Sequence, residues 1–385
     1  MLRIGIALFA LTLVFPTVHA ANSIPLLPPP KLEASSYLLI DAQTSKVLVE
    51  HDAHEKNAPA SLTKIMTGYV VEEELRRGRL DVDEEVPISV KAWRTGGSKM
   101  FIREGTRVKV SDLLKGVIIQ SGNDASVALA EHIAGSEDQF AELMNQQAEL
   151  LGMKNSQFRN ATGLPDEAHY STATDLALLT QALIVNHPDQ YELYSQRSYT
   201  FNNIEQPNRN RLLWRDRSVD GVKTGFTNAA GYCLVASAER NGMRLISVVL
   251  GTDSDEARMR ESQKLLSYGF RNFETKTLYE PDNTLQEQPI YFGTVESLPM
   301  GVAEDVVLTF PKGYYQDIEA SLSVPAYFEA PVKKGDELGT VELRLGDEVI
   351  YTGSLVAQID VEESGIFSQF GDYIYLMFDQ PDANE

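Results

Sequence analysis

Cysteine is nearly absent from this 385-residue sequence, which contains only Cys233. A single cysteine excludes an intramolecular disulfide, and it excludes a metal site built from several cysteine thiolates. Cys233 lies in the apolar segment 232–236, which is typical of a buried strand. Buried free thiols usually behave as small hydrophobic groups, so we expect Cys233 to be structural.

Basic residues are also scarce, with 34 lysines and arginines against 55 aspartates and glutamates and a formal net charge of -21. This balance argues against a nucleic-acid-binding protein, because such proteins neutralise phosphates with Lys and Arg. It also disfavours electrostatic adhesion to anionic lipid. The 6 histidines have no carboxylate or cysteine partners at ligand spacing, so zinc hydrolysis is disfavoured and no metal or organic cofactor is expected.

The N-terminus has the pattern of a targeting segment. Arg3 precedes an apolar run over residues 4–18, and Ala20 offers a small residue at the expected cleavage point. This pattern predicts a secretory signal peptide over residues 1–20. An uncleaved membrane anchor is the alternative interpretation.

The next part of the chain mixes strand and helix patterns. Two short apolar runs, 37–40 and 47–49, predict a hairpin, and the dipeptide Asn241-Gly242 predicts a second hairpin between strands 231–238 and 243–250. Helical patterns occupy the intervening sequence and the segment after the second hairpin. The expected helices cover residues 61–77, 111–120, 125–133, 138–151, 174–186 and 256–268.

Residues 277–361 differ, because short alternating stretches are separated by scattered Gly and Pro and predict a small β-sandwich. In the tail, apolar residues recur at helical spacing on one face, from Ile366 to Phe378. Such a face could lie on a membrane, on a partner or on the β-domain. No Lys or Arg follows Arg344, so membrane binding would depend on apolar burial alone.

The segment Ser61-Leu62-Thr63-Lys64 stands where a loop turns into an apolar helical run. Residues three apart share one helix face, roughly 5–6 Å apart at Cβ. A helix N-terminus favours negative charge, which suits a serine that must become an alkoxide and a lysine that must lose its proton. Taken alone, the pattern favours a simpler interpretation, a capping serine and a solvated lysine.

Two further motifs change that interpretation: Ser121-Gly122-Asn123 in a break between helices, and Lys223-Thr224-Gly225 on a strand. Singly, the first could be a turn and the second an exposed strand start. In this order and in these contexts, the three motifs form the site described for penicillin-recognising serine enzymes.

The likeness extends over essentially the whole mature chain. The sequence resembles the D-alanyl-D-alanine carboxypeptidases among the low-molecular-mass penicillin-binding proteins. Beyond the three motifs, the matching segments are 208–210, 212–214, 219–225, 230–232, 234–238, 261–262, 264–266 and 269–270. Residues 372–374 and 376–378 resemble that family's amphipathic membrane anchor.

The resemblance implies a role for each catalytic residue. Ser61 would attack the carbonyl of the penultimate D-alanine of a peptidoglycan stem peptide. Lys64, kept neutral by burial and nearby positive charge, would be the general base. Ser121 would pass the proton to the leaving amine, and Asn123 would hold Lys64 or the substrate amide.

The resemblance also implies a set of substrate-binding residues. Lys223 and Thr224 would hold the terminal carboxylate, while Gly225 lets the backbone approach closely. Backbone N–H groups of Ser61 and Phe226 would form the oxyanion hole, in which losing one donor commonly costs about 2.7–4 kcal/mol.

Four further positions near the implied site are Arg209, Arg258, Phe226 and His169. Arg209 and Arg258 match arginines close to the family's site, but a structural or surface role is an equal alternative. Phe226 replaces the histidine that is usual after Lys-Thr-Gly, which removes a side chain able to contact the substrate carboxylate. His169 lies in a loop that the family places beside the cleft, and a structural role is favoured.

These observations predict a two-part α/β (α+β) protein. The catalytic domain, residues 21–275, should be a penicillin-binding-protein/β-lactamase-like transpeptidase domain, with helices flanking an antiparallel sheet that carries Lys223 near its edge. A small all-β sandwich should follow over residues 276–362. An amphipathic helical tail should occupy residues 363–385.

The implied function is a serine-type D-Ala-D-Ala carboxypeptidase in cell-wall biogenesis, which acts on stem peptides and is inhibited covalently by β-lactam antibiotics. Its expected location is the periplasm, on the outer face of the inner membrane. The alternatives are a D,D-endopeptidase, a β-lactamase and a non-catalytic cell-wall binding protein. No Glu-x-x-Leu-Asn motif supports the β-lactamase.

Overall fold

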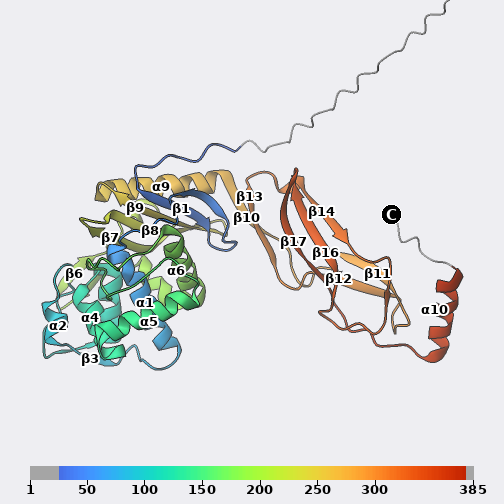
Figure 1. Ribbon diagram of the computed structural model, residues 1–385, viewed down its shortest axis with the longest axis horizontal. Helices are drawn as coiled ribbons and strands as arrows, with labels where there is room; N and C mark the ends of the chain where they lie inside the picture. The colour runs from blue at the N-terminus through green and yellow to red at the C-terminus, as the bar shows by residue number, and fades with distance from the viewer. Residues whose placement is uncertain (1–25, 379–385) are drawn as a thin grey trace, which may run out of the picture. The chain divides into compact units, whose positions relative to one another are not determined.

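The structure is a computed structural model that describes residues 26–378 (Figure 1). The predicted signal peptide, residues 1–20, lies outside these residues. The chain divides into two compact units. The larger unit comprises Leu27–Glu280 and Asp305–Lys312, and the described part of the smaller unit comprises Leu26, Pro281–Glu304 and residues 313–378.

A five-stranded antiparallel sheet, in the order β2-β1-β9-β8-β7, is the centre of the larger unit. Its strands are β1 (Ser36–Asp41), β2 (Val47–His51), β7 (Val219–Thr227), β8 (Gly231–Arg240) and β9 (Met243–Thr252). Asn241 and Gly242 both have positive φ in the β8–β9 turn, which confirms the predicted hairpin. Strand β7, which carries Lys223-Thr224-Gly225, lies at the edge of the sheet, as predicted.

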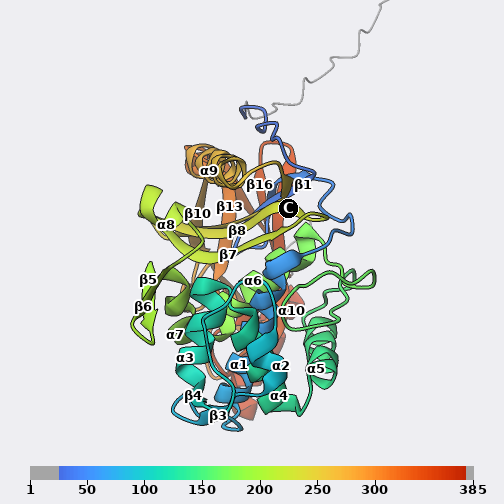
Figure 2. The ribbon, with the colours of Figure 1, turned by 90° about the vertical axis from the view of Figure 1, so that its left-hand side faces the viewer.

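Helices cover both faces of this sheet (Figures 1 and 2). Helix α9 (Asp255–Asn272) packs on one face, while α1 (Thr63–Arg76) and α6 (Ala173–Asn186) pack on the other. Successive side chains of a strand point to opposite faces. On β8, Cys233 and Val235 therefore enter the core on the α1 side, whereas Leu234 and Ala236 enter the core on the α9 side. Burial on both sides explains why β8 and β9 read as continuous apolar runs.

The remaining elements of the larger unit surround this sheet. The helices are α2 (Val90–Arg94), α3 (Val110–Lys115), α4 (Asn123–Ala134), α5 (Glu137–Leu150), α7 (Pro188–Tyr191) and α8 (Leu212–Arg215). Three short turns of helix are η1 (Ala60–Leu62), the π-helical η2 (Gly116–Gln120) and η3 (Glu192–Ser195). Three two-stranded sheets pair β3 (Glu85–Pro87) with β4 (Arg107–Lys109), β5 (Ser198–Phe201) with β6 (Ile204–Pro207), and β10 (Phe273–Tyr279) with β13 (Val306–Pro311).

The smaller unit is all-β up to its last helix. Its six strands follow the order β14-β16-β17-β12-β11-β15. They are β11 (Gln286–Tyr291), β12 (Ser297–Gly301), β14 (Ile318–Ser323), β15 (Phe328–Glu329), β16 (Glu337–Leu345) and β17 (Glu348–Ala357), with the turn η4 (Tyr315–Asp317) before β14. Helix α10 (Ile366–Phe378) follows and confirms the predicted helical tail as far as the structure describes it. The predicted fold class is therefore confirmed.

Candidate active site

Ser61 and Lys64 lie side by side where η1 passes into α1. Lys64 Nζ donates a hydrogen bond to Ser61 Oγ at 3.2 Å. Ser61 is partly exposed, whereas the Lys64 side chain is almost fully buried. The predicted contact between hydroxyl and amine is present, because the first turn of α1 continues directly from η1.

The Lys64 amine has two further acceptors, Asn123 Oδ1 at 2.7 Å and the Thr162 carbonyl oxygen at 2.6 Å. The pKa of Lys64 is lowered from 10.5 to about 7, first by burial and then by the nearby Arg209 guanidinium, while Asp124 and Glu137 act in the opposite sense. An amine with this pKa is neutral in much of the population near pH 7. Its lone pair can then accept the Ser61 proton.

Thr162 belongs to a loop whose importance the sequence analysis missed. Asn160 Oδ1 accepts hydrogen bonds from the backbone N–H groups of Thr162 and Gly163, which closes a tight turn. Gly163 has φ of +80°, and a Cβ there would lie 1.7 Å from the Ala60 carbonyl oxygen. The asparagine and glycine spacing indicates a turn, but only the folded chain shows that this turn supplies an acceptor for Lys64.

Ser121-Gly122-Asn123 joins η2 to α4. Ser121 ends η2 in the left-handed conformation, with φ of 64°, and its buried Oγ has no hydrogen-bond partner within the described chain. The amide of Asn123 bridges Lys64 and the Gly96 carbonyl oxygen, to which its Nδ2 donates at 2.7 Å. The fully buried Asp124, another residue that the sequence analysis did not single out, accepts hydrogen bonds from backbone N–H groups of residues 100–102. It therefore fixes this segment against the preceding loop.

Lys223-Thr224-Gly225 on β7 packs directly against η1. A Cβ at Gly225 would lie 3.1 Å from the Pro59 carbonyl oxygen and 3.3 Å from Ala60 Cβ, so the absence of a side chain permits the approach. Lys223 is buried, and its Nζ donates to the Thr224 carbonyl oxygen at 3.1 Å. Burial, then the charges of Lys64, Arg209 and Arg258, hold the pKa of Lys223 well below its usual range. An anion bound here would relieve that repulsion.

The two candidate arginines differ in their surroundings. Arg209 is exposed, and its Nε donates to the Gln120 carbonyl oxygen at 3.2 Å, next to Ser121 in the chain. Arg258 is buried, and its Nη1 donates to the Gly225 carbonyl oxygen at 3.0 Å. Arg258 also pairs with Asp255 on α9. Arg258 therefore contacts the Lys223-Thr224-Gly225 motif, whereas Arg209 contacts the residue that precedes Ser121.

Phe226 and His169 lie at the margin of this cluster. The Phe226 side chain is 48% exposed and its ring centroid is 4.2 Å from that of Tyr232. His169 is buried, with Nε2 2.9 Å from Thr63 Oγ1 at the start of α1. Burial lowers the pKa of His169 to about 4, so the ring is neutral near pH 7.

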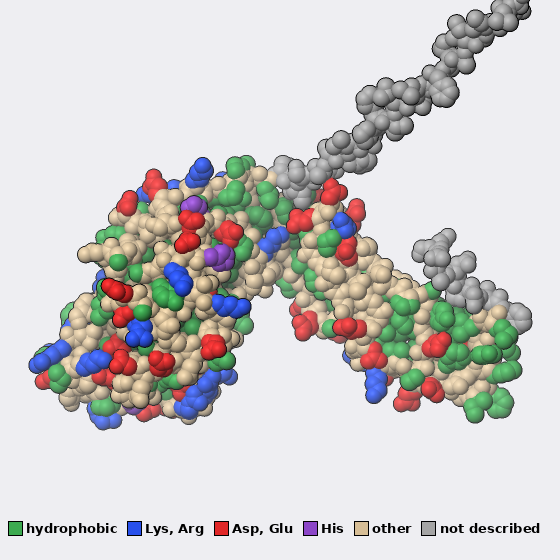
Figure 3. All heavy atoms as spheres, in the orientation of Figure 1, with side chains coloured by type: hydrophobic (Ala, Val, Ile, Leu, Met, Phe, Trp, Pro, Cys, Tyr) green, Lys and Arg blue, Asp and Glu red, His purple; other side chains and the backbone are tan. Residues whose placement is uncertain are grey.

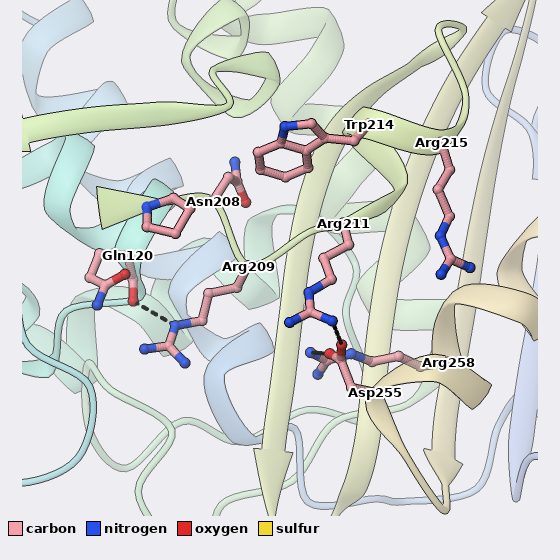
Figure 4. Close-up of a pocket in the computed structure, with 9 residues that line it drawn as sticks. Gln120, Asn208, Arg209, Arg211, Trp214, Arg215, Asp255 and Arg258 are labelled. Atoms are coloured by element: carbon pink, nitrogen blue, oxygen red, sulfur yellow. Dashed lines mark hydrogen bonds and ion pairs between the residues drawn. The ribbon is translucent and has the colours of Figure 1, made fainter. Parts of the chain in front are cut away.

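Two hollows border the motif residues. One, of about 770 Å³, is lined by Gln120, Arg209 and Arg258 together with residues of the β6–α8 segment (Figure 4). The other, of about 280 Å³, is lined by residues 58–60, the loop 163–169, Thr227 and Ala229. No cluster of three or more His, Cys, Asp or Glu side chains suited to a metal ion occurs in residues 26–378.

Comparison with known proteins gives a consistent result. The D-alanyl-D-alanine carboxypeptidase family (peptidase S11) matches residues 24–254, and the C-terminal domain of penicillin-binding protein 5 matches residues 273–363. The D-alanyl-D-alanine carboxypeptidase DacC of Escherichia coli (strain K12) is 44% identical over 378 residues, which cover 96% of this chain and 94% of the relative.

Two solved structures extend the likeness to three dimensions. Penicillin-binding protein 5 from Haemophilus influenzae is 42% identical, with a TM-score of 0.82 over 88% of this chain and 100% of that chain. Penicillin-binding protein D2 from Listeria monocytogenes, in its ampicillin-bound form, is 33% identical, with a TM-score of 0.59 over 63% of this chain and 100% of that chain. With its three motifs gathered around one buried lysine, the chain belongs to the D-alanyl-D-alanine carboxypeptidases of the peptidase S11 family, which are serine hydrolases.

Proposed function

We propose that this carboxypeptidase removes the terminal D-alanine of peptidoglycan stem pentapeptides through an acyl-enzyme on Ser61. One observation carries the proposal: the Lys64 amine lies 3.2 Å from Ser61 Oγ, and burial brings its pKa to about 7. A hydroxyl in contact with a neutral amine provides a nucleophile together with its general base at physiological pH.

The reaction then proceeds in two halves. Ser61 Oγ attacks the carbonyl carbon of the penultimate D-alanine while Lys64 Nζ takes the hydroxyl proton. The tetrahedral intermediate collapses, the C–N bond breaks, and Ser121 Oγ relays the proton to the leaving nitrogen, so that D-alanine departs. Water, deprotonated by Lys64, attacks the Ser61 ester and releases the shortened peptide with a new carboxylate.

Substrate positioning falls to the edge strand and its neighbours. Lys223, Thr224 and Arg209 hold the terminal carboxylate, since Lys223 offers a buried amine with no carboxylate partner among the described residues, and a bound anion would raise its lowered pKa again. Asn123 holds Lys64 in place, and Gly225 keeps the strand close to Ser61. Arg258 positions β7 through the Gly225 carbonyl, and the backbone N–H groups of Ser61 and Phe226 receive the oxyanion.

Penicillins enter the same reaction, because the strained lactam carbonyl replaces the scissile peptide carbonyl and Ser61 becomes acylated. The ampicillin-bound structure of the Listeria relative supports this. The ester persists because the opened ring stays attached and no glutamate motif of the class A β-lactamase type is present to activate a hydrolytic water.

We further propose that residues 1–20 are a signal peptide and that the mature catalytic domain, residues 21–275, is followed by a spacer domain over 276–362. The enzyme then acts in the periplasm, on the outer face of the inner membrane. No helix within residues 26–378 is long and apolar enough to cross a membrane. We propose that the tail, residues 363–385, attaches the enzyme to the membrane surface.

Helix α10 supports peripheral attachment. Its exposed apolar side chains gather on one surface of the smaller unit (Figure 3), and Phe367 is 96% exposed. Asp372 Oδ2 accepts a hydrogen bond from the Phe292 backbone N–H at 2.7 Å, and the Tyr375 ring contacts the ring of Tyr291. These two contacts hold the other side of the helix against the strands of the smaller unit. A helix of this kind can lie in the membrane interface.

The proposed function is tested by D-alanine release from a stem peptide that ends in D-alanyl-D-alanine, with the purified mature protein. Ser61→Ala should abolish both D-alanine release and covalent attachment of a labelled penicillin. Cys233→Ala, a conservative change at a buried thiol on the neighbouring strand, should leave both intact. Labelling that survives Ser61→Ala would overturn the assignment, and rapid release of hydrolysed penicillin would favour the β-lactamase instead.

A further inference from the structure

The smaller of the two hollows, of about 280 Å³, lies beside the nucleophile. Part of its lining is residues 58–60, which end immediately before Ser61, and part is the loop 163–169. Thr227, the last residue of β7, and Ala229 also line it. The hollow is therefore adjacent in the chain to the nucleophile and to the end of the edge strand.

The direction of the substrate in the proposed reaction determines which part of it faces this hollow. On β7, Lys223 and Thr224 hold the terminal carboxylate of the leaving D-alanine, and the Phe226 N–H binds the oxyanion. The peptide therefore lies along β7 with its C-terminus towards Lys223. The residues that precede the scissile bond extend the other way, towards Thr227 and Ala229, which line the hollow. The hollow is thus on the acyl side of the scissile bond.

His169 brings an unused polar atom to the hollow. Its side chain lines the hollow and is only 4% exposed. Its Nε2 is 2.9 Å from Thr63 Oγ1, whereas its buried Nδ1 has no hydrogen-bond partner within residues 26–378. A buried polar atom without a partner is costly, and most such atoms are satisfied by the protein, by water or by a ligand. The ring can therefore form a hydrogen bond with a molecule that fills the hollow.

The rest of the lining combines an apolar surface with two carboxylates. Residues 59–60 and 164–165 contribute hydrocarbon, whereas Asp166 and Glu167 contribute negative charge. Asp166 Oδ1 accepts a hydrogen bond from the Ala168 backbone N–H at 2.8 Å. Neither carboxylate forms an ion pair with a Lys or Arg among the described residues, and no Lys or Arg of that part of the chain lines the hollow. This lining suits an aliphatic chain that ends in a positive charge.

The penultimate D-alanine does not account for this hollow. Its carbonyl carbon lies at Ser61 in the proposed reaction, and its side chain is a single methyl group. A methyl group would fill only a small part of about 280 Å³ and would leave both carboxylates without a partner. The residue that precedes this D-alanine is the next one on the acyl side, and its side chain can be longer and charged.

We propose that the hollow lined by Asp166, Glu167 and His169 is the subsite for the residue that precedes the penultimate D-alanine, and that it selects a side chain with an aliphatic stem and a terminal ammonium group, as in lysine. The ammonium group pairs with Asp166 and Glu167, while the stem packs on the apolar lining. His169 Nδ1 forms a hydrogen bond with the backbone of the bound residue. This inference rests on the proposed function, because the same Ser61 is acylated.

Three substrates separate the contributions of charge and stem. N-acetylated peptides carry lysine, norleucine or alanine before D-alanyl-D-alanine, and norleucine has the aliphatic stem of lysine without its ammonium group. We expect kcat/KM for D-alanine release from the lysine peptide to exceed that from the norleucine peptide by about twofold to fivefold at low salt, with a smaller ratio at high salt. The norleucine peptide should exceed the alanine peptide by about threefold to tenfold, because the stem is removed from water.

Removal of the two carboxylates tests their role directly. The double variant Asp166→Asn/Glu167→Gln should lower kcat/KM for the lysine peptide to about that for the norleucine peptide. The Asn side chain keeps an Oδ1 acceptor for the Ala168 N–H, so the turn should persist. Glu304→Gln/Asp305→Asn is the control, because it removes two charges from another exposed pair of neighbouring carboxylates that does not line the hollow. It should leave the preference for lysine unchanged.

The variant His169→Gln tests the hydrogen bond from the ring. Gln keeps a polar atom near Thr63 but has no counterpart of Nδ1. We expect kcat/KM for the lysine and norleucine peptides to fall by about threefold to tenfold. N-Acetyl-D-alanyl-D-alanine lacks the residue that would occupy the subsite, so its kcat/KM should fall less. An equal fall for all of these substrates would contradict the contact with the bound residue.

The result of each measurement distinguishes this inference from the proposed function. Equal kcat/KM for the lysine and norleucine peptides with the wild-type enzyme would overturn the subsite alone. A lysine preference that survives in Asp166→Asn/Glu167→Gln would do the same, because D-alanine is still released in both cases. No release of D-alanine from any of the peptides would instead overturn the proposed function.

Discussion

Helices α1 and α10 are both rich in apolar residues, but they have opposite environments. In α1, most residues are buried, including the charged side chains Lys64, Glu72 and Glu73. In α10, by contrast, the apolar side chains are exposed, including Ile366 at 82% and Met377 at 63%. Burial on α1 changes the chemistry of a lysine, whereas exposure on α10 leaves a hydrophobic face available for another surface. Similar sequence composition therefore has two functional consequences, and which one applies depends on what covers the helix.

The largest expected effect follows from replacing Lys64 on α1 with a side chain that always carries a positive charge. Lys64→Arg keeps a long cationic side chain but cannot provide a neutral amine, because a guanidinium is not deprotonated in proteins. We expect acylation of Ser61 by a labelled penicillin to slow by about 100- to 10 000-fold. Normal labelling in this variant would contradict Lys64 as the base, and circular dichroism would show whether the fold is kept.

A substitution in the loop that contains Thr162 and Gly163 should disrupt the close packing that buries Lys64. Gly163→Ala places a Cβ 1.7 Å from the Ala60 carbonyl oxygen, so η1 or the loop must move. We expect the free energy of unfolding to fall by about 1–3 kcal/mol, with a loss of penicillin acylation, because the Thr162 carbonyl shifts away from Lys64.

Gly78→Ala is the matched control for that variant. Gly78 also has positive φ, at +66°, but its added Cβ would meet nothing within 4 Å. It therefore reports the backbone penalty alone. Thermal unfolding and acylation rates measured for both variants separate the two effects, and equal losses would contradict the packing argument.

The exposed face of α10 leads to a smaller effect, on membrane association. Phe367→Ser should weaken binding to zwitterionic lipid vesicles by about threefold to tenfold, since it removes exposed apolar surface that the bilayer would bury. Binding should change little with salt, because no Lys or Arg follows Arg344.

Co-sedimentation with vesicles measures this binding. Leu150→Ser, at a residue 74% exposed on α5, controls for loss of surface apolar area elsewhere and should bind as the wild type does. Wild-type binding that requires anionic lipid would contradict attachment by apolar burial.

The smallest expected effect concerns the pH profile of acylation. The neutral Lys64 amine is the base, so the rate should rise with pH through about 7, the lowered pKa of this group. Arg209 is one cause of that lowering. Arg209→Gln removes its charge, raises the pKa of Lys64 and should move the rise in rate to higher pH.

Rates of penicillin attachment between pH 5 and 9 would measure this shift. Arg211→Gln is the control, because Arg211 is not among the charges that lower the pKa of Lys64. A midpoint that stays in place for Arg209→Gln, or that moves equally in both variants, would contradict the assignment of the charge effect to Arg209.

Much of the architecture was predictable from local patterns. The turn at Asn241-Gly242, the helix that ends before Gly78, and the break at Ser121 each depend on residues close in sequence. Short elements with weak patterns, such as α2 and the β3–β4 and β5–β6 pairs, were not predicted, because three to five residues carry too little periodicity.

The sequence by itself determined the three motifs, their order and the elements that carry them, because hydroxyl, amine and glycine chemistry is inherent in residue type and local spacing. Only the tertiary structure decided that Thr162 supplies an acceptor to Lys64, that Asp124 fixes the loop before Ser121, and that Arg211 and Arg215 line one hollow with Arg209. These contacts join segments that are far apart in the chain, so local sequence patterns do not predict them. Burial, and with it the pKa of Lys64, is a property of the packed protein that no single segment contains.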